Sequence, residues 1–161
     1  MAPPIDAWIE RTGHTTAEEI EMRFMVIVKA TPETENGAMP TTEELAAMGN
    51  YNEELVKAGV MLAGDGLYPS AKGARVAFDA KGATTVIDGP FTEAKELIAG
   101  FWIWELPSLQ DAVEWLKKAP FQSGEVEIRQ VHGPEAFESI VTPEIQAQED
   151  RLREQISAQS Q

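Results

Sequence analysis

The sequence predicts an α+β fold in which two helices cover one face of a four-stranded sheet. Four β-rich runs predict the strands, at residues 23–30, 60–64, 101–106 and 125–131. Two amphipathic patterns with start signals fall between the first and second runs and between the third and fourth. The order is β-α-β, a hairpin, and β-α-β again. This is the split βαβ or ferredoxin-like arrangement.

The first half begins with the β-rich run RFMVIVKA. Thr41 and Glu44 then form a capping box that predicts the start of a helix. Gly59 supplies a stop signal for this helix, and the run VMLAG follows as the second strand. Between cap and stop, apolar residues recur at near-helical spacing: Leu45, Met48, Leu55 and Val56.

The second half begins after a predicted hairpin. Residues 74–80 and 84–88 flank the turn Lys81-Gly82. The strand FWIWEL comes next, and Ser108 with Asp111 caps a helix that we expect to close at Pro120. Its predicted buried stripe is Leu109, Ala112, Val113 and Leu116. The last strand, residues 125–131, alternates apolar and polar side chains.

Two of the predicted strands are apolar at consecutive positions, 24–28 and 101–104, so both of their faces favour burial. Two helices cover only one face of a sheet. The sequence has no spare strands with which to cover the other. We therefore expect a homodimer in which two copies of the sheet pack face to face.

The 161 residues are enough for one domain with a sizeable core. We expect an N-terminal extension at residues 1–21, the domain at 22–134, and a polar C-terminal tail at 135–161. Thr142 and Pro143 resemble a helix start within the tail. A thin apolar stripe would follow on that helix: Ile145, Leu152 and Ile156.

Composition argues against several classes of partner. The 27 acidic and 13 basic residues give a formal net charge of −14, which repels nucleic acids and anionic membranes. No apolar run approaches the ~20 residues of a membrane helix, and the first residues do not resemble a secretory signal. The absence of Cys fits a cytoplasmic protein. His14 and His132 are isolated, so neither a metal site nor a cofactor is expected.

The stretch VIDGPFTEAKE carries a family resemblance. Asp88-Gly89-Pro90-Phe91, followed by TEAKE, is similar to the signature of the DGPF family within the YCII-related proteins. Similar motifs continue in order from MRFM at residue 22 to the EVE and Arg129 of the last strand. The resemblance covers about residues 22–131 and implies a dimeric α+β barrel.

Two functions stay open under this resemblance. One is a small-molecule-binding barrel protein with a regulatory role linked to a sigma-factor pathway, since many DGPF proteins are encoded beside extracytoplasmic-function sigma factors. The other is a cofactor-independent acid-base enzyme, of a lyase, isomerase or dehydrochlorinase type. The chain departs from the His-Asp pair proposed for YCII enzymes, because its first helix contains no His and position 68, often His in similar sequences, is Tyr68.

Asp65 and Asp88 are the candidate catalytic residues. Asp65 follows the second strand between two glycines, and Asp88 ends a strand before Gly-Pro. If both carboxylates face one cavity, their proximity would separate their pKa values and provide an acid and a base. The alternative for both is a turn acid that accepts backbone hydrogen bonds. The candidate ligand-binding residues are Tyr68, Tyr51, Lys95, Arg129 and Trp102, with core packing or surface ion pairs as the alternatives.

Overall fold

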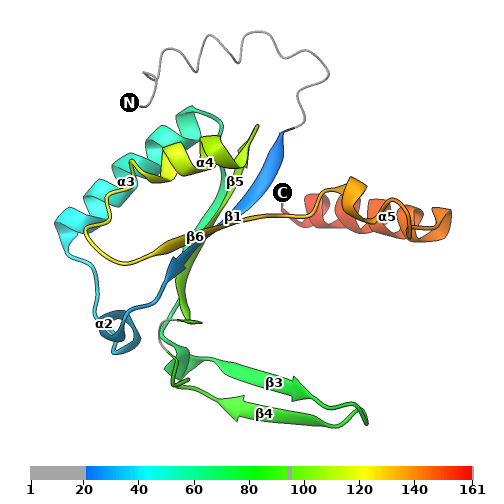
Figure 1. Cartoon of the computed structure of the whole chain (residues 1–161), viewed down its shortest axis with the longest axis horizontal. Coiled ribbons are helices and arrows are strands. Elements are labelled where there is room, and N and C mark those ends of the chain that lie inside the picture. The colour runs from blue at the N-terminus through cyan, green and yellow to red at the C-terminus, as the bar shows by residue number, and fades with distance from the viewer. Residues whose placement is uncertain (1–20, 94–95, 161) are drawn as a thin grey trace. The chain divides into compact units, whose positions relative to one another are not determined.

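The computed structural model describes residues 21–93 and 96–160. The chain divides into two compact units, one ending at Val131 and the other comprising His132–Gln161. The first unit contains an antiparallel sheet in the order β2-β5-β1-β6 (Figure 1). Its strands are β1 (Met22–Lys29), β2 (Met61–Gly66), β5 (Ile98–Leu106) and β6 (Val126–Gln130). This order confirms the predicted ferredoxin-like plan.

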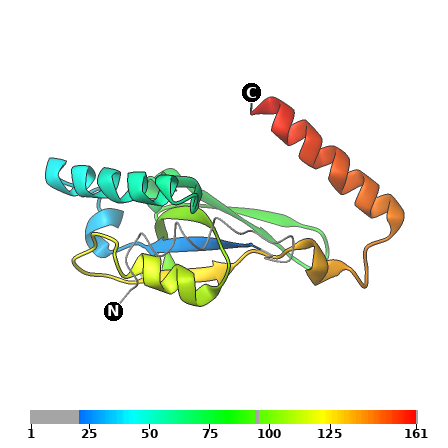
Figure 2. The same ribbon diagram turned by 90° about the horizontal axis from the view of Figure 1, so that it is seen from above.

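Helices α3 (Thr42–Lys57) and α4 (Leu109–Leu116) lie on the same face of this sheet (Figure 1). Figure 2 looks down on them and shows both running roughly along the strands. The predicted caps are present: Thr41 and Glu44 form a reciprocal capping box, and the Ser108 side chain accepts a hydrogen bond from the Asp111 backbone. Gly59 has a φ of 72°, a left-handed conformation that suits glycine and ends α3. Helix α4 ends at Leu116, before the expected Pro120.

The core lies between the helices and the inner face of the sheet. Alternate residues of β5, namely Trp102, Trp104 and Leu106, point to this side and are buried. They pack with side chains from both helices and from β1, including Leu55, Trp115 and Phe24. Burying side chains of this size contributes about 1.5–3 kcal/mol each. The helices are therefore held by the apolar inner face that the strands present.

The outer face of the sheet carries a second set of apolar side chains. The strand register places Met25 opposite Ile103, and Ile27 opposite Phe101. Ile27 is buried by its neighbours, while Met25, Phe101 and Ile103 stay half-buried. No helix of the first unit covers this face in the described residues. The prediction that both faces of these strands are apolar is confirmed at the level of the single chain.

The predicted hairpin is present but forms a sheet of its own. Strands β3 (Ala74–Phe78) and β4 (Thr84–Asp88) pair only with each other in the described chain, and their side chains are exposed. Asp79 stabilises the turn, since its Oδ1 accepts hydrogen bonds from the backbone amides of Lys81 and Ala83. Two short elements that the sequence did not predict lie in the loops, α2 (Pro32–Glu35) and the 3₁₀ helix η1 (Ser70–Lys72).

The second unit contains the 3₁₀ helix η3 (Pro134–Phe137) and α5 (Pro143–Gln159). The Thr142 hydroxyl caps α5 by accepting from the Ile145 backbone amide, as predicted. The expected apolar stripe is exposed: Ile145, Leu152 and Ile156. Within residues 21–93 and 96–160, no helix combines the length and the apolar character that crossing a bilayer requires.

Leu55 and Leu45 offer a matched test of the core, because both belong to α3. Leu55 is fully buried, whereas Leu45 is 58% exposed. We expect Leu55→Ala to lower the free energy of unfolding by about 2–5 kcal/mol, through lost apolar contacts and a residual void. Leu45→Ala should change it by no more than about 0.5 kcal/mol. Urea denaturation measures both, and equal effects would contradict the packing described.

Candidate ligand-binding cavity

A cavity of about 370 Å³ lies where α3 faces the ends of β2 and β5. Its size falls within the range typical of small-molecule sites, about 300–1,000 Å³. Helix α3 contributes Met48 and Asn52, one helical turn apart. The remaining lining residues come from the strands and from the loop after α4: Val28, Gly64, Asp65, Gly66, Ala99, Gly100, Phe101, Trp102 and Phe121.

Three glycines create this space. Gly64 and Gly66 lie on the same side of β2, because side chains alternate along a strand. Gly66 is paired with Gly100 of β5, so neither strand carries a side chain at this pair of positions. A Cβ at Gly64 would lie 2.7 Å from Trp102 Cδ1, and one at Gly100 would lie 3.0 Å from the Asp65 carbonyl oxygen. The glycines therefore form a flat floor that larger residues would fill.

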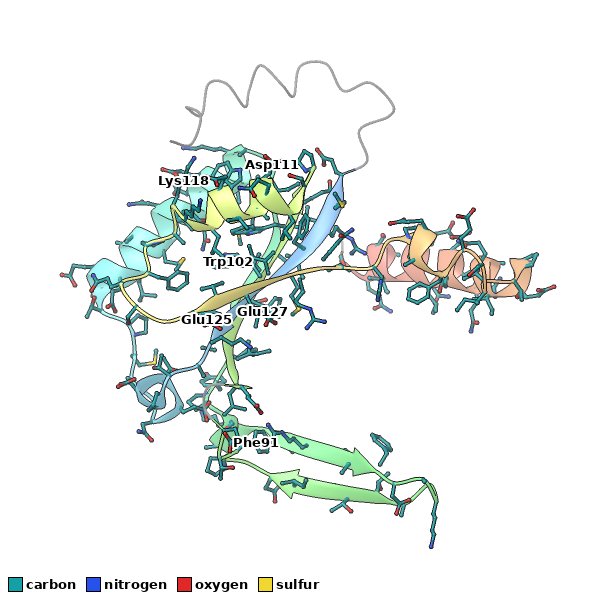
Figure 3. All side chains as sticks on the ribbon, in the orientation of Figure 1. Phe91, Trp102, Asp111, Lys118, Glu125 and Glu127 are labelled. Atoms are coloured by element: carbon teal, nitrogen blue, oxygen red, sulfur yellow. The ribbon has the colours of Figure 1, made fainter. Side chains whose placement is uncertain are left out.

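Trp102 forms one wall and is held in place by Asn52. The Trp102 indole Nε1 donates a hydrogen bond of 3.0 Å to Asn52 Oδ1. The Trp102 ring also makes edge contacts with Tyr51 and Phe121, at centroid distances of 6.0 and 6.1 Å. Figure 3 shows Trp102 on the helix side of the sheet. The predicted ligand-binding residue Trp102 thus lies at the cavity and is also part of the core.

Asp65 is the one ionisable residue among the described residues that line the cavity. It is exposed and lies opposite Phe101 in the strand register, so its side chain is on the outer face of the sheet and only its backbone borders the cavity. Asp88 lies elsewhere. It ends β4, in the hairpin, and the described lining residues do not include it. The structure thus places the two candidate acids on different sheets.

Tyr51, Tyr68 and Arg129, which are also predicted to bind a ligand, are not among the described residues that line this cavity. Tyr51 is buried, and its hydroxyl donates a 2.7 Å hydrogen bond to the Trp115 carbonyl. Burial, with the nearby Glu54 carboxylate adding to it, raises the pKa of Tyr51 above its ordinary value. Tyr68 is 77% exposed, and its ring lies 4.1 Å from Lys72 Nζ.

Arg129 of β6 lies on the outer face of the sheet, where the register places it opposite Met25. Its Nη1 is 3.8 Å from a carboxylate oxygen of Glu127, and Lys29 Nζ is 4.0 Å from the other. Arg129 thus has the surface ion pair that the sequence offered as the alternative to ligand binding. Lys95 lies outside the described residues.

The DGPF segment forms a turn at the base of the hairpin, and hydrogen bonds hold this turn in place. The Ser70 hydroxyl donates to a Glu35 carboxylate oxygen at 2.5 Å and accepts from the Phe91 backbone amide at 2.9 Å. The Gly89 amide donates to the Gly73 carbonyl, and a Cβ on Gly89 would overlap the Ser70 carbonyl. These bonds connect α2, η1 and the end of β4.

Phe91 completes this turn. Its ring lies 3.8 Å from the Arg75 guanidinium, a cation–π contact, and Figure 3 shows it at the base of the hairpin. These contacts give Gly89 and Phe91 structural roles in the turn at the base of the hairpin.

Sequence reasoning missed Asn52, Met48 and Phe121 as cavity residues. Met48 and Asn52 could have been found from their i, i+4 spacing in a helix expected to cover the sheet. The alternation of Gly64 and Gly66 on one side of a strand was also visible in the sequence. Phe121 follows α4 in a loop, and no local pattern indicates where it packs. Among the described residues, no three of His, Asp or Glu are grouped so as to hold a metal ion.

Comparison with known families identifies the class of protein to which the chain belongs. The model of the YCII-related domain matches residues 22–133, which is more than half of the chain. The protein therefore belongs to the YCII-related family, of which the DGPF proteins are a subfamily. The search of curated proteins found no match. Family membership agrees with the α+β fold and does not by itself specify a ligand or a reaction.

Gly64 and Gly66 form a matched pair for testing the cavity floor. The Gly64→Ala methyl group would displace the Trp102 ring and weaken its bond to Asn52. We expect a loss of about 1–3 kcal/mol in the free energy of unfolding and an altered tryptophan fluorescence spectrum. Gly66→Ala meets open space and should leave stability unchanged or higher by up to ~1 kcal/mol. A stable Gly64→Ala protein with a wild-type spectrum would contradict the geometry.

Proposed function

We propose that this protein binds a small organic molecule in the cavity between α3 and the ends of β2 and β5. The observation that carries the proposal is the cavity itself, which combines an apolar wall, a bare glycine floor and one polar side chain, Asn52. Such an arrangement is typical of ligand sites, where a few polar groups orient a mainly apolar ligand.

An acid-base enzyme is the competing hypothesis. It requires Asp65 and Asp88 to act on one substrate. Asp65 lines the cavity, but Asp88 belongs to the hairpin sheet, where it begins the DGPF turn. Binding needs only groups that are already together, so it is the function that the geometry supports better. A regulatory role in a sigma-factor pathway is proposed from the DGPF resemblance. A cytoplasmic location is proposed because the sequence contains no Cys.

We also propose that the outer face of the sheet is covered by a second copy of the chain. Met25, Phe101 and Ile103 lie half-buried in the middle of this face, on the two central strands. The charges of Glu127 and Arg129 lie on the edge strand β6, and that of Lys29 lies at the end of β1. An apolar centre with a polar margin is the usual anatomy of a protein interface. Two copies related by a two-fold axis would cover each other's apolar centre.

The binding proposal is tested by filling the cavity. Gly66→Leu places a side chain over the glycine floor, where a Cβ meets no atom within 4 Å. In a thermal-shift screen of neutral and charged metabolites at millimolar concentration, we expect compounds that stabilise the wild type. Their shifts should fall by at least half in Gly66→Leu.

The control for this experiment is Ala77→Leu, which adds the same side chain on the exposed hairpin. This variant should keep the wild-type shifts. Ligands that stabilise wild type and Gly66→Leu equally would place binding elsewhere, and a screen with no stabilising compound would count against a binding function.

The dimer proposal is tested by placing a charge in the centre of the outer face. Ile103→Glu would bury an unpaired carboxylate between two sheets, which costs several kcal/mol. We expect light scattering at micromolar concentration to give twice the chain mass for the wild type and the chain mass for Ile103→Glu. Leu45→Glu, on the exposed side of α3, should remain dimeric. A wild-type protein with the mass of one chain would refute the proposal.

A further inference from the structure

We infer that the cavity selects an uncharged, flat ring compound that carries a carbonyl group, such as an aromatic carboxamide, ketone or ester. This inference rests on the proposed binding function and adds the chemical class of the ligand. It is argued from three features of the cavity: the orientation of the Asn52 amide, the charge of the lining residues, and the shape of the glycine floor.

The indole of Trp102 fixes the orientation of Asn52. An indole N–H only donates hydrogen bonds, so the Asn52 atom that it contacts must be the carbonyl oxygen Oδ1. The amide nitrogen Nδ2 is therefore on the other side of the side chain. Within the described residues, Nδ2 makes no hydrogen bond. Asn52 is half-buried and lines the cavity, so it offers two N–H donors to an acceptor on a ligand.

The lining residues disfavour an anion. The described residues that line the cavity include no Lys, Arg or His. Asp65 does not supply a counter-charge either, because its side chain shares the outer face with Phe101. A carboxylate ligand would provide acceptors for Asn52 but would leave water for a site without a compensating cation. A cationic ligand such as an amidinium meets no carboxylate that points into the cavity and provides no acceptor for Asn52 Nδ2. A neutral carbonyl group satisfies Asn52 without either penalty.

The floor and walls favour a flat ring. Gly66 and Gly100 are paired and carry no side chains, so a planar ligand can lie directly on the peptide groups. The Trp102 and Phe121 rings meet at an interplanar angle of 73° and present aromatic surface to the same cavity. Offset and edge contacts of this kind favour aromatic ligands over aliphatic chains of equal size.

Four one-ring probes separate these features: benzamide, benzoate, benzamidinium and toluene. The first three have the same shape and differ in charge and in the presence of an acceptor, and toluene lacks the polar group. Titrations of ¹⁵N-labelled protein, followed at the Trp102 indole and the Gly66 amide, give a Kd for each probe. We expect benzamide to bind at least tenfold more tightly than benzoate and benzamidinium, and more tightly than toluene.

Asn52→Asp sharpens the test because it keeps the shape and the acceptor for Trp102 while it removes the Nδ2 donors. This variant should lose the preference for benzamide and favour benzamidinium. Asn50→Asp makes the same charge change two residues away on α3, at an exposed position, and should keep the wild-type ranking. The wild-type ranking stands as a test even if Asn52→Asp does not fold.

The outcomes separate the two proposals. Equal affinities for all four probes, tightest binding of benzoate, or an unchanged ranking in a folded Asn52→Asp would overturn the ligand class while leaving a cavity that binds rings. Absence of any shift at Trp102 and Gly66 with all four probes, toluene included, would overturn the binding function in the cavity as well.

Discussion

The central strands β1 and β5 are apolar on both faces, and the rest of the structure depends on this constraint. On the inner face, β5 presents Trp102, Trp104 and Leu106, which hold α3 and α4 against the sheet. On the outer face, the same strand presents Phe101 and Ile103, which the helices do not reach in the described chain. One strand thus determines both where the helices pack and which surface remains for a partner.

The cavity arises where β2 and β5 lack side chains. Gly64, Gly66 and Gly100 lie where the apolar inner face would otherwise continue, so the helix and the strands enclose space. The Trp102 indole connects the core to this space, because its ring packs among aromatic neighbours while its N–H orients Asn52. Stability and the proposed ligand recognition therefore share one side chain. Substitutions of Trp102 are expected to affect both, whereas Gly66, where a Cβ meets open space, and Asn52 are the cleaner positions to change.

The DGPF segment shows how a conspicuous motif can be explained by structure. Glu35, Ser70 and Phe91 connect α2, η1 and the turn after β4 through two short hydrogen bonds. The lack of room for a Cβ at Gly89 explains why glycine is needed there. This connection ties the exposed hairpin to the loops around it. It adds contacts that support the hairpin, since a two-stranded hairpin alone is marginally stable. The motif thus orders a turn, and the polar groups of the cavity come from other segments.

The sequence by itself determined the strands of the sheet, the hairpin, the two helices that cover the sheet and the order of these elements, because these depend on local chemistry. Alternation, capping boxes and Gly59 act within a few residues, and the structure places both helix starts where the caps predict them. The sequence did not determine which residues meet. Asn52, Gly66 and Phe121 come together only when α3, the strand pairing and the loop after α4 are in place. Asp88 lies on the separate hairpin sheet, so it is not among the residues that line the cavity. Which distant segments pair depends on the burial of side chains across the whole fold, and a local sequence pattern does not contain that information.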